Sequence, residues 1–225
     1  MLEACALPYR LIPVNISKNE QFTPEFLAIS PNNRVPAIVD NASFEQLTGG
    51  SAPVAVFESG ACVLYLAQKT GQFMFTDLRG RYAVMQWLMW QMGGLGPMAG
   101  QNGHFLLYAP EKIPYAVERY GNEVDRLYGV LDTQLRRPAA YVAGKDYSIA
   151  DMASFSWVRT HKAQQVDLDK FPHAQRWYNM LFERPATKRG LDVGKELRAG
   201  TLTDEARKAL FGQTAQSVKA GAQQL

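Results

Sequence analysis

The stretch NNRVPAIVD, residues 32–40, places a proline at the start of a short apolar run. A residue before proline is pushed toward an extended conformation, so the run PAIVD is expected to form a strand. If the Val35–Pro36 bond is cis, the N–H and C=O of Val35 are left unpaired and could pair with a short peptide laid alongside, as an added strand would. The alternative, which sequence physics alone favours, is a trans proline at the first residue of a strand.

The stretch FESGACVLYLAQKTG, residues 57–71, reads as a helix with charged chemistry at its start. Ser59 is expected to cap this helix, which runs to Lys69 and ends at Gly71. Free N–H groups at a helix start favour an anion, whereas the Glu58 carboxylate beside them favours a cation. Together they could hold a ligand that bears both charges, such as a free amino-acid end. The alternative is an ordinary capped helix with an acidic first turn.

Strand and helix signals alternate over residues 1–75, which indicates a small α/β unit. Met1 to Ala6 consists mostly of strong helix formers without a preceding cap, and Tyr9–Ile16 is predicted to be a strand. Thr23 and Pro24 mark the start of a helix, and the run VAVF predicts another strand. The residues before VAVF, 41–53, are rich in turn formers and are predicted to be a loop.

Only helical signals follow from Asp77 onward. In YSIAD, Ser148 is expected to be an N-cap, with Asp151 reaching back to it in a capping box, and another helix begins at Pro172 and stops before Pro185. A long amphipathic helix begins at Pro114, and its apolar side chains recur every three or four residues: Val117, Tyr120, Val124, Leu127, Leu131 and Leu135.

Three parts are therefore predicted along the chain. Residues 1–75 form an α/β domain, and residues 76–198 form an all-α domain. Residues 199–225 form a tail with one possible helix, Thr203–Phe211, and are otherwise expected to be mobile.

Composition limits the class of function. The 225 residues carry a net charge of +3, and Lys and Arg are scattered among Asp and Glu, which argues against a nucleic-acid surface. The spacing of Cys5 and Cys62 is not that of metal ligands. Two cysteines without a disulfide framework suit a reducing compartment such as the cytoplasm. Both are expected to be small buried residues rather than redox thiols. The most apolar stretch, residues 83–100, is interrupted by glutamines and ends in glycines, so a buried helix followed by a break is expected rather than a membrane span.

These motifs, taken in order, resemble a glutathione transferase. The features that carry the resemblance are Val-Pro-Ala, then Glu-Ser-Gly at a helix start, then GKDYSIADMASF in an all-helical half. The stretches KNEQFTPEFLAISPNNRVPAIVD and QWLMWQMGGLGPMAGQN are similar to the bacterial Nu-class group, relatives of the yeast nitrogen regulator. The resemblance runs from residue 1 to about residue 198.

The resemblance implies a thioredoxin-like N-terminal domain, an all-α C-terminal domain and a homodimer, with glutathione as cosubstrate and no metal. It implies that Val35, before a cis Pro36, pairs its backbone with the cysteinyl part of glutathione, and that Glu58 and Ser59 hold the γ-glutamyl end. Gln21 and Asn33 match positions near the peptide, and Arg126 on the long helix matches a basic residue that faces the cleft. The seven expected glutathione-binding residues are Gln21, Asn33, Val35, Pro36, Glu58, Ser59 and Arg126.

The first residues match only the second half of the family's first helix. The family's first strand and the turn whose hydroxyl faces the glutathione sulfur have no counterpart here, so no catalytic residue is expected among the 225. Three explanations stay open. Met1 could be an internal start, the chain could be a truncated member that serves as a partner or regulator, or a strand could be recruited from elsewhere.

Two functions from different classes follow. The first is an enzyme that uses glutathione to reduce disulfides or to transfer its thiol to a small electrophile, since members of this group often favour disulfide reduction. The second is a non-catalytic binding or regulatory protein. The 225 residues by themselves are expected to show weak turnover or none.

Overall fold

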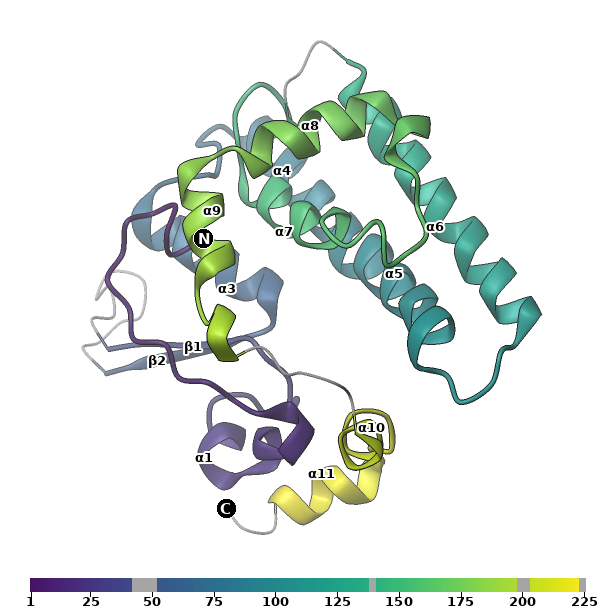
Figure 1. Ribbon diagram of the computed structural model, residues 1–225. Helices are drawn as coiled ribbons and strands as arrows, with labels where there is room; N and C mark the ends of the chain where they lie inside the picture. The colour runs from purple at the N-terminus through teal and green to yellow at the C-terminus, as the bar shows by residue number, and fades with distance from the viewer. Residues whose placement is uncertain (42–51, 138–140, 198–202, 223–225) are drawn as a thin grey trace. The chain divides into compact units, whose positions relative to one another are not determined.

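The computed structural model describes residues 1–41, 52–137, 141–197 and 203–222 (Figure 1). The chain divides into two compact units. The sheet unit comprises Leu2, Ala6–Lys69 and Leu191–Leu225, and the helical unit comprises Met1, Glu3–Cys5 and Thr70–Gly190. An α/β part and an all-helical part are thus both present, as the sequence predicts. The unit boundaries differ from the predicted domain limits because the C-terminal segment groups with the first part of the chain.

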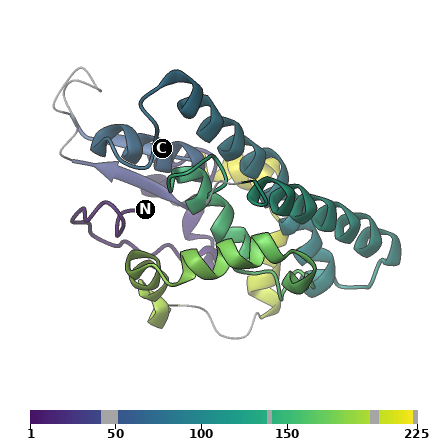
Figure 2. The same ribbon diagram turned by 90° about the horizontal axis from the view of Figure 1, so that it is seen from above.

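The sheet unit is built on two antiparallel strands that lie side by side in both views (Figures 1 and 2). Their register pairs Ala37 with Phe57 and Asp40 with Val54. The elements of this unit are the short 3-10 helices η1 (Ile16–Lys18), η2 (Glu20–Phe22) and η6 (Lys195–Leu197), the strands β1 (Ala37–Asp40) and β2 (Val54–Phe57), and the helices α1 (Pro24–Leu27), α3 (Ser59–Thr70), α10 (Asp204–Phe211) and α11 (Ala215–Ala222).

Two predictions for the first residues are wrong. Met1 to Ala6 forms hydrogen-bonded turns rather than a helix, and Ala6 has a positive φ of 52°. Residues 9–15 of the predicted strand Tyr9–Ile16 have no regular secondary structure, and its last residue begins η1. Pro13 cannot donate to a strand ladder, and no strand of the described residues pairs with this segment. The predicted loop over residues 41–53 lies mostly outside the described residues.

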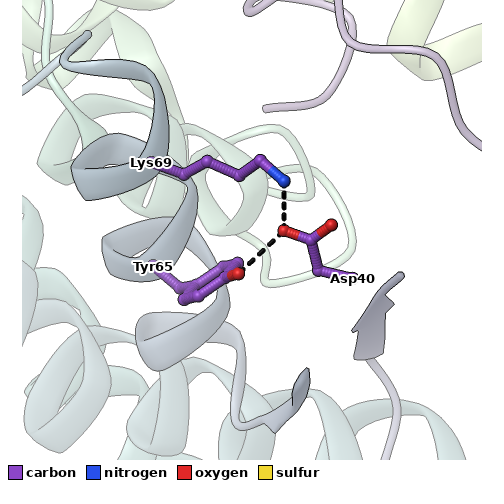
Figure 3. Close-up of polar contacts among 3 residues, drawn as sticks. All are labelled: Asp40, Tyr65 and Lys69. Atoms are coloured by element: carbon purple, nitrogen blue, oxygen red, sulfur yellow. Dashed lines mark hydrogen bonds and ion pairs between the residues drawn. The ribbon is translucent and has the colours of Figure 1, made fainter. Parts of the chain in front are cut away.

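A polar contact joins the end of β1 to the last turns of α3 (Figure 3). The Tyr65 hydroxyl donates to Oδ2 of Asp40 at 2.7 Å, and the Lys69 ammonium forms an ion pair with the same oxygen. Burial, together with the hydrogen bond to the Asp40 carboxylate and the charge of that carboxylate, raises the pKa of Tyr65 to about 12. The contact therefore ties the C-terminal end of β1 to the C-terminal part of α3.

The helical unit has its core around α6. The predicted apolar stripe of this helix is confirmed in its C-terminal part, where Val124, Leu127, Leu131 and Leu135 are buried. They pack with residues of α7 and α8, including the fully buried Trp177. The elements of this unit are α4 (Leu78–Trp90), α5 (Gly96–Gly103), α6 (Pro114–Leu135), α7 (Ile149–Val158), α8 (Pro172–Phe182), the 3-10 helix η5 (Leu168–Lys170), the π-helical turns η3 (Gln91–Leu95) and η4 (His104–Tyr108), and α9 (Pro185–Asp192), which runs past the unit boundary.

The break expected at the end of the apolar stretch 83–100 is not found: α4 continues through the π-helical turn η3 into α5 and then into η4. None of the helices in the described part of the chain has the length and apolar character needed to cross a membrane.

The capping box at the start of α7 is confirmed and extends into the core. Asp151 is fully buried, and its two oxygens accept four hydrogen bonds at 2.9–3.0 Å, from the backbone and hydroxyl of Ser148, the Val142 N–H and the Trp177 indole. Burial raises the pKa of this carboxyl, and the four donors oppose that rise. Asp151 thus connects the start of α7 to α8 and to the segment that precedes α7.

Removal of this carboxylate is expected to destabilise the protein strongly. Asp151→Ala leaves the Trp177 and Val142 donors buried without an acceptor and removes the helix cap, so the free energy of unfolding should fall by about 3 kcal/mol. Urea denaturation followed by circular dichroism measures the change. Asp146→Ala, at an exposed position of the same loop, should change it by less than about 0.5 kcal/mol. If the two substitutions lowered the free energy of unfolding equally, the proposed contribution of Asp151 to stability would be contradicted.

Candidate functional site

The corner between β2 and α3 carries an exposed carboxylate in an unusual backbone conformation. Glu58 has a φ of +66°, which is uncommon for a residue with a side chain and occurs at turns and at some functional sites. Its carbonyl accepts from the Cys62 N–H at 2.8 Å, so α3 begins at Ser59 and Glu58 precedes the helix. The expected N-cap role of Ser59 is therefore wrong: Ser59 is the first helical residue, exposed at the helix start.

The loop before β1 is shaped by its own side chains. The Ser30 hydroxyl donates to the Arg34 carbonyl at 2.8 Å, and the buried Asn33 amide donates to the Gln21 carbonyl at 3.2 Å. Asn33 adopts a left-handed conformation with φ +56°, which asparagine tolerates better than most residues. The loop therefore has a defined shape up to Val35.

The Val35–Pro36 peptide bond is cis, which decides between the two alternatives that the sequence left open. Val35 is 48% exposed. Within the described residues, neither its N–H nor its C=O makes a hydrogen bond. One donor and one acceptor of the main chain are thus available to an extended peptide beside the start of β1.

A hydrogen bond connects the two parts of this site. Asn32 of the loop donates from its side-chain amide to Oε1 of Glu58 at 2.8 Å. The backbone of Val35, the Glu58 carboxylate and the N-terminus of α3 therefore belong to one polar cluster of the sheet unit. Such a cluster can pair a peptide main chain, attract an ammonium group with the carboxylate and accommodate a carboxylate at the helix start.

Two of the expected residues have surroundings that the sequence did not indicate. The Gln21 side chain is only 1% exposed, and in the described part of the protein neither atom of its amide has a hydrogen-bond partner. Arg126 lies on α6 in the helical unit, where its guanidinium donates twice to Glu123 at 2.7 and 2.9 Å. That donation lowers the pKa of Glu123. Six of the seven expected residues thus lie in the sheet unit, and Arg126 belongs to the other unit.

Sequence reasoning missed Asn32 and Arg34, which flank Asn33 in the loop. Asn32 holds Glu58, and the Arg34 guanidinium donates to the Gln213 side chain at 2.6 Å. The run of polar residues NNR directly before Val35 was the available signal, since a loop that must support a proline turn uses such side chains for hydrogen bonds.

Both cysteines are buried and free of disulfide bonds, which confirms that they are small buried residues. The Cys62 thiol donates to the Val56 carbonyl at 3.3 Å and is 4% exposed, and burial raises its pKa to about 11. Cys5 lies 3.7 Å from the Thr70 hydroxyl. Among the residues that the structure describes, no three His, Cys, Asp or Glu side chains are grouped as a metal site would require.

Comparison with known proteins matches both parts of the chain to one family. The model of the glutathione S-transferase N-terminal domain matches residues 1–69, and that of the C-terminal domain matches residues 97–185. The disulfide-bond oxidoreductase YfcG of Escherichia coli is 50% identical over 204 residues, which cover 91% of this chain and 90% of that protein.

Two solved structures are similar over most of the chain. A glutathione transferase of Burkholderia graminis with two glutathione molecules bound per subunit is 41% identical, with a TM-score of 0.79 over 86% of this chain and 81% of that one. A glutathione transferase of Pseudomonas putida with one glutathione disulfide bound per subunit is 40% identical, with a TM-score of 0.79 over 85% of this chain and 84% of that one.

The thiol of Cys62 is expected to be inert in the folded protein. With a pKa of about 11, only about one thiol in a thousand is ionised at pH 8, so iodoacetamide should alkylate Cys62 at least about 100-fold more slowly than a model thiol. Mass spectrometry of the labelled peptide measures the rate, and labelling in urea is the control. Native labelling as fast as that in urea would show the thiol to be accessible and ionised.

Proposed function

The chain belongs to the glutathione S-transferase family, and on this premise we propose that it binds glutathione and uses its thiol to reduce disulfides. The observation that carries the proposal is the polar cluster of the sheet unit, where an exposed main-chain donor and acceptor at Val35 accompany the Glu58 carboxylate. Glutathione is a small peptide whose γ-glutamyl end bears both an ammonium and a carboxylate, which is the charge pattern that this cluster complements.

Each residue of the cluster has one proposed role. Val35 pairs its N–H and C=O with the cysteinyl residue of glutathione. Glu58 attracts the ammonium of the γ-glutamyl end, while Ser59 and the N–H groups at the N-terminus of α3 donate hydrogen bonds to its carboxylate. Asn33 and cis Pro36 shape the loop that presents Val35, whereas Gln21 and Arg126 are proposed as additional contacts of the peptide.

The proposed chemistry is thiol–disulfide exchange. The thiolate of one glutathione attacks a sulfur of the disulfide substrate, so a mixed disulfide forms and a substrate thiolate leaves and takes up a proton. A second glutathione attacks the glutathione sulfur of the mixed disulfide, which releases the other substrate thiol and forms glutathione disulfide. The two glutathiones supply both electrons. No residue of this chain is proposed as catalytic; the proposed role of the cluster is to hold and orient the peptide.

A homodimer is proposed from the exposed side of α4. Leu78, Tyr82 and Met89 are exposed and spaced four and seven residues apart, which places them on one helical face. An exposed row of large apolar side chains is typical of a surface that another subunit covers. A cytoplasmic location stays a prediction from the two free cysteines.

Removal of the Glu58 charge tests the γ-glutamyl assignment. Glu58→Gln keeps the shape of the side chain but loses a charge-assisted contact, so affinity for glutathione should fall about 10- to 100-fold. Isothermal titration calorimetry measures the dissociation constant. Glu111→Gln makes the same change at an exposed position of the helical unit and should bind as the unaltered protein does. Unchanged affinity of Glu58→Gln would show that another group holds the γ-glutamyl end.

Binding and turnover separate the two functional hypotheses. If the proposal is right, the protein binds glutathione and glutathione disulfide, and it reduces a small mixed disulfide with glutathione in an assay coupled to glutathione reductase. Because the 225 residues are predicted to be weak in turnover, binding is the primary readout. Binding without any turnover would favour the non-catalytic regulatory protein, and absence of binding would overturn the proposal.

A further inference from the structure

The C-terminal segment packs on the part of the sheet unit that leads into the site. We call residues 203–222 the strap. Its first helix, α10, packs against η1, and its second helix, α11, packs against η2 and α1 (Figure 1). These contacts are all made inside the sheet unit. The strap therefore touches the segment that holds Gln21.

The burial of Gln21 is at odds with its proposed role as a ligand contact. Gln21 lies in η2, and its amide is closed off from solvent, with no partner for either polar atom in the described part of the protein. A buried amide without partners is unfavourable, so a state in which it meets water or a ligand gains hydrogen bonds. For that to happen an element that packs against η2 must move, and α11 is such an element.

A hydrogen bond connects the strap to the binding loop. Arg34 lies between Asn33 and Val35 in sequence, and its Nη1 donates to Oε1 of Gln213 at 2.6 Å. Gln213 in turn donates to the Ala209 carbonyl at 2.9 Å, which orients its amide toward Arg34. A neutral amide is a weaker acceptor for a guanidinium than a carboxylate is, so an anionic ligand can compete for Arg34.

The packing of the strap is thin. In α10, Ala206 and Ala209 are buried and Leu210 is half-buried, whereas Phe211 and Val218 of the strap are exposed. A segment with little buried apolar surface opens at low cost compared with the core of a protein.

We propose that the strap covers the Gln21 side of the glutathione site, that Gln213 latches it to Arg34, and that it opens when an anionic peptide ligand enters. Opening exposes the Gln21 amide and releases the Arg34 guanidinium. This inference rests on the proposed function, and it assigns to residues 203–222 the control of ligand entry.

The first experiment changes the strength of the latch in the full chain. Gln213→Glu replaces the neutral acceptor with a carboxylate that forms an ion pair with Arg34, so association of glutathione disulfide in stopped-flow measurements should slow about two- to fivefold at low salt. Gln213→Ala should speed it. Because salt screens exposed charges, the effect of Gln213→Glu should shrink at high ionic strength. The matched control is Gln216→Glu. Gln216 is an exposed strap residue without a partner among the described residues. This variant should bind glutathione disulfide at the same rate as the unaltered protein.

The second experiment follows the strap itself. Saturation of the unaltered protein with glutathione disulfide should reduce the hydrogen-exchange protection of backbone amides in α10 and α11. The proposed role of the strap would be overturned by unchanged or increased protection of these amides. Equal association rates for Gln213→Glu, Gln213→Ala and Gln216→Glu would overturn it as well. Either result would leave the proposed function intact. Failure of the unaltered protein to bind glutathione or its disulfide would overturn both.

Discussion

The contact of Asp40 with Tyr65 and Lys69 is the interaction on which the arrangement of the site depends. Asp40 ends β1, and the two partner side chains lie in the last turns of α3 (Figure 3). The opposite end of β1 leads back to Val35, and the opposite end of α3 leads back to Glu58. Since both carboxylate and ammonium are largely shielded from water, with 16% and 18% of their side chains exposed, loss of one partner would leave a poorly solvated charge.

The site that results is polar and partly strained. Glu58 and Asn33 both adopt positive φ values, and Asn32 and Asn33 use their amides to hold Glu58 and the Gln21 carbonyl. Such conformations persist only when surrounding contacts fix them, which the paired β1 and β2 supply here. The cysteines take no part, because both are buried, and the raised pKa of Cys62 keeps that thiol protonated. Any thiol chemistry at this site therefore uses a thiol that the ligand brings.

Several features could be predicted from sequence because their causes are local. The stripe on α6, the bounds of α8 between two prolines and the capping box of Ser148 and Asp151 follow from helical periodicity, the missing proline N–H and a spacing of three residues. Family motifs likewise identified the residues of the β2–α3 corner and of the binding loop. The strand expected over Tyr9–Ile16 failed because a strand needs a neighbour, which an apolar run alone does not specify.

By itself, then, the sequence determined the helical periodicity, the caps, the family and the polar residue types of the candidate site. Only the tertiary structure decided the burial of Gln21, and it fixed the cis state of Pro36, which the family resemblance implied but sequence physics alone did not. It also joined Arg34 to Gln213, which lie 179 residues apart along the chain. The physical reason is that caps and periodicity act within a few residues, whereas burial and long-range hydrogen bonds depend on which distant segments pack together.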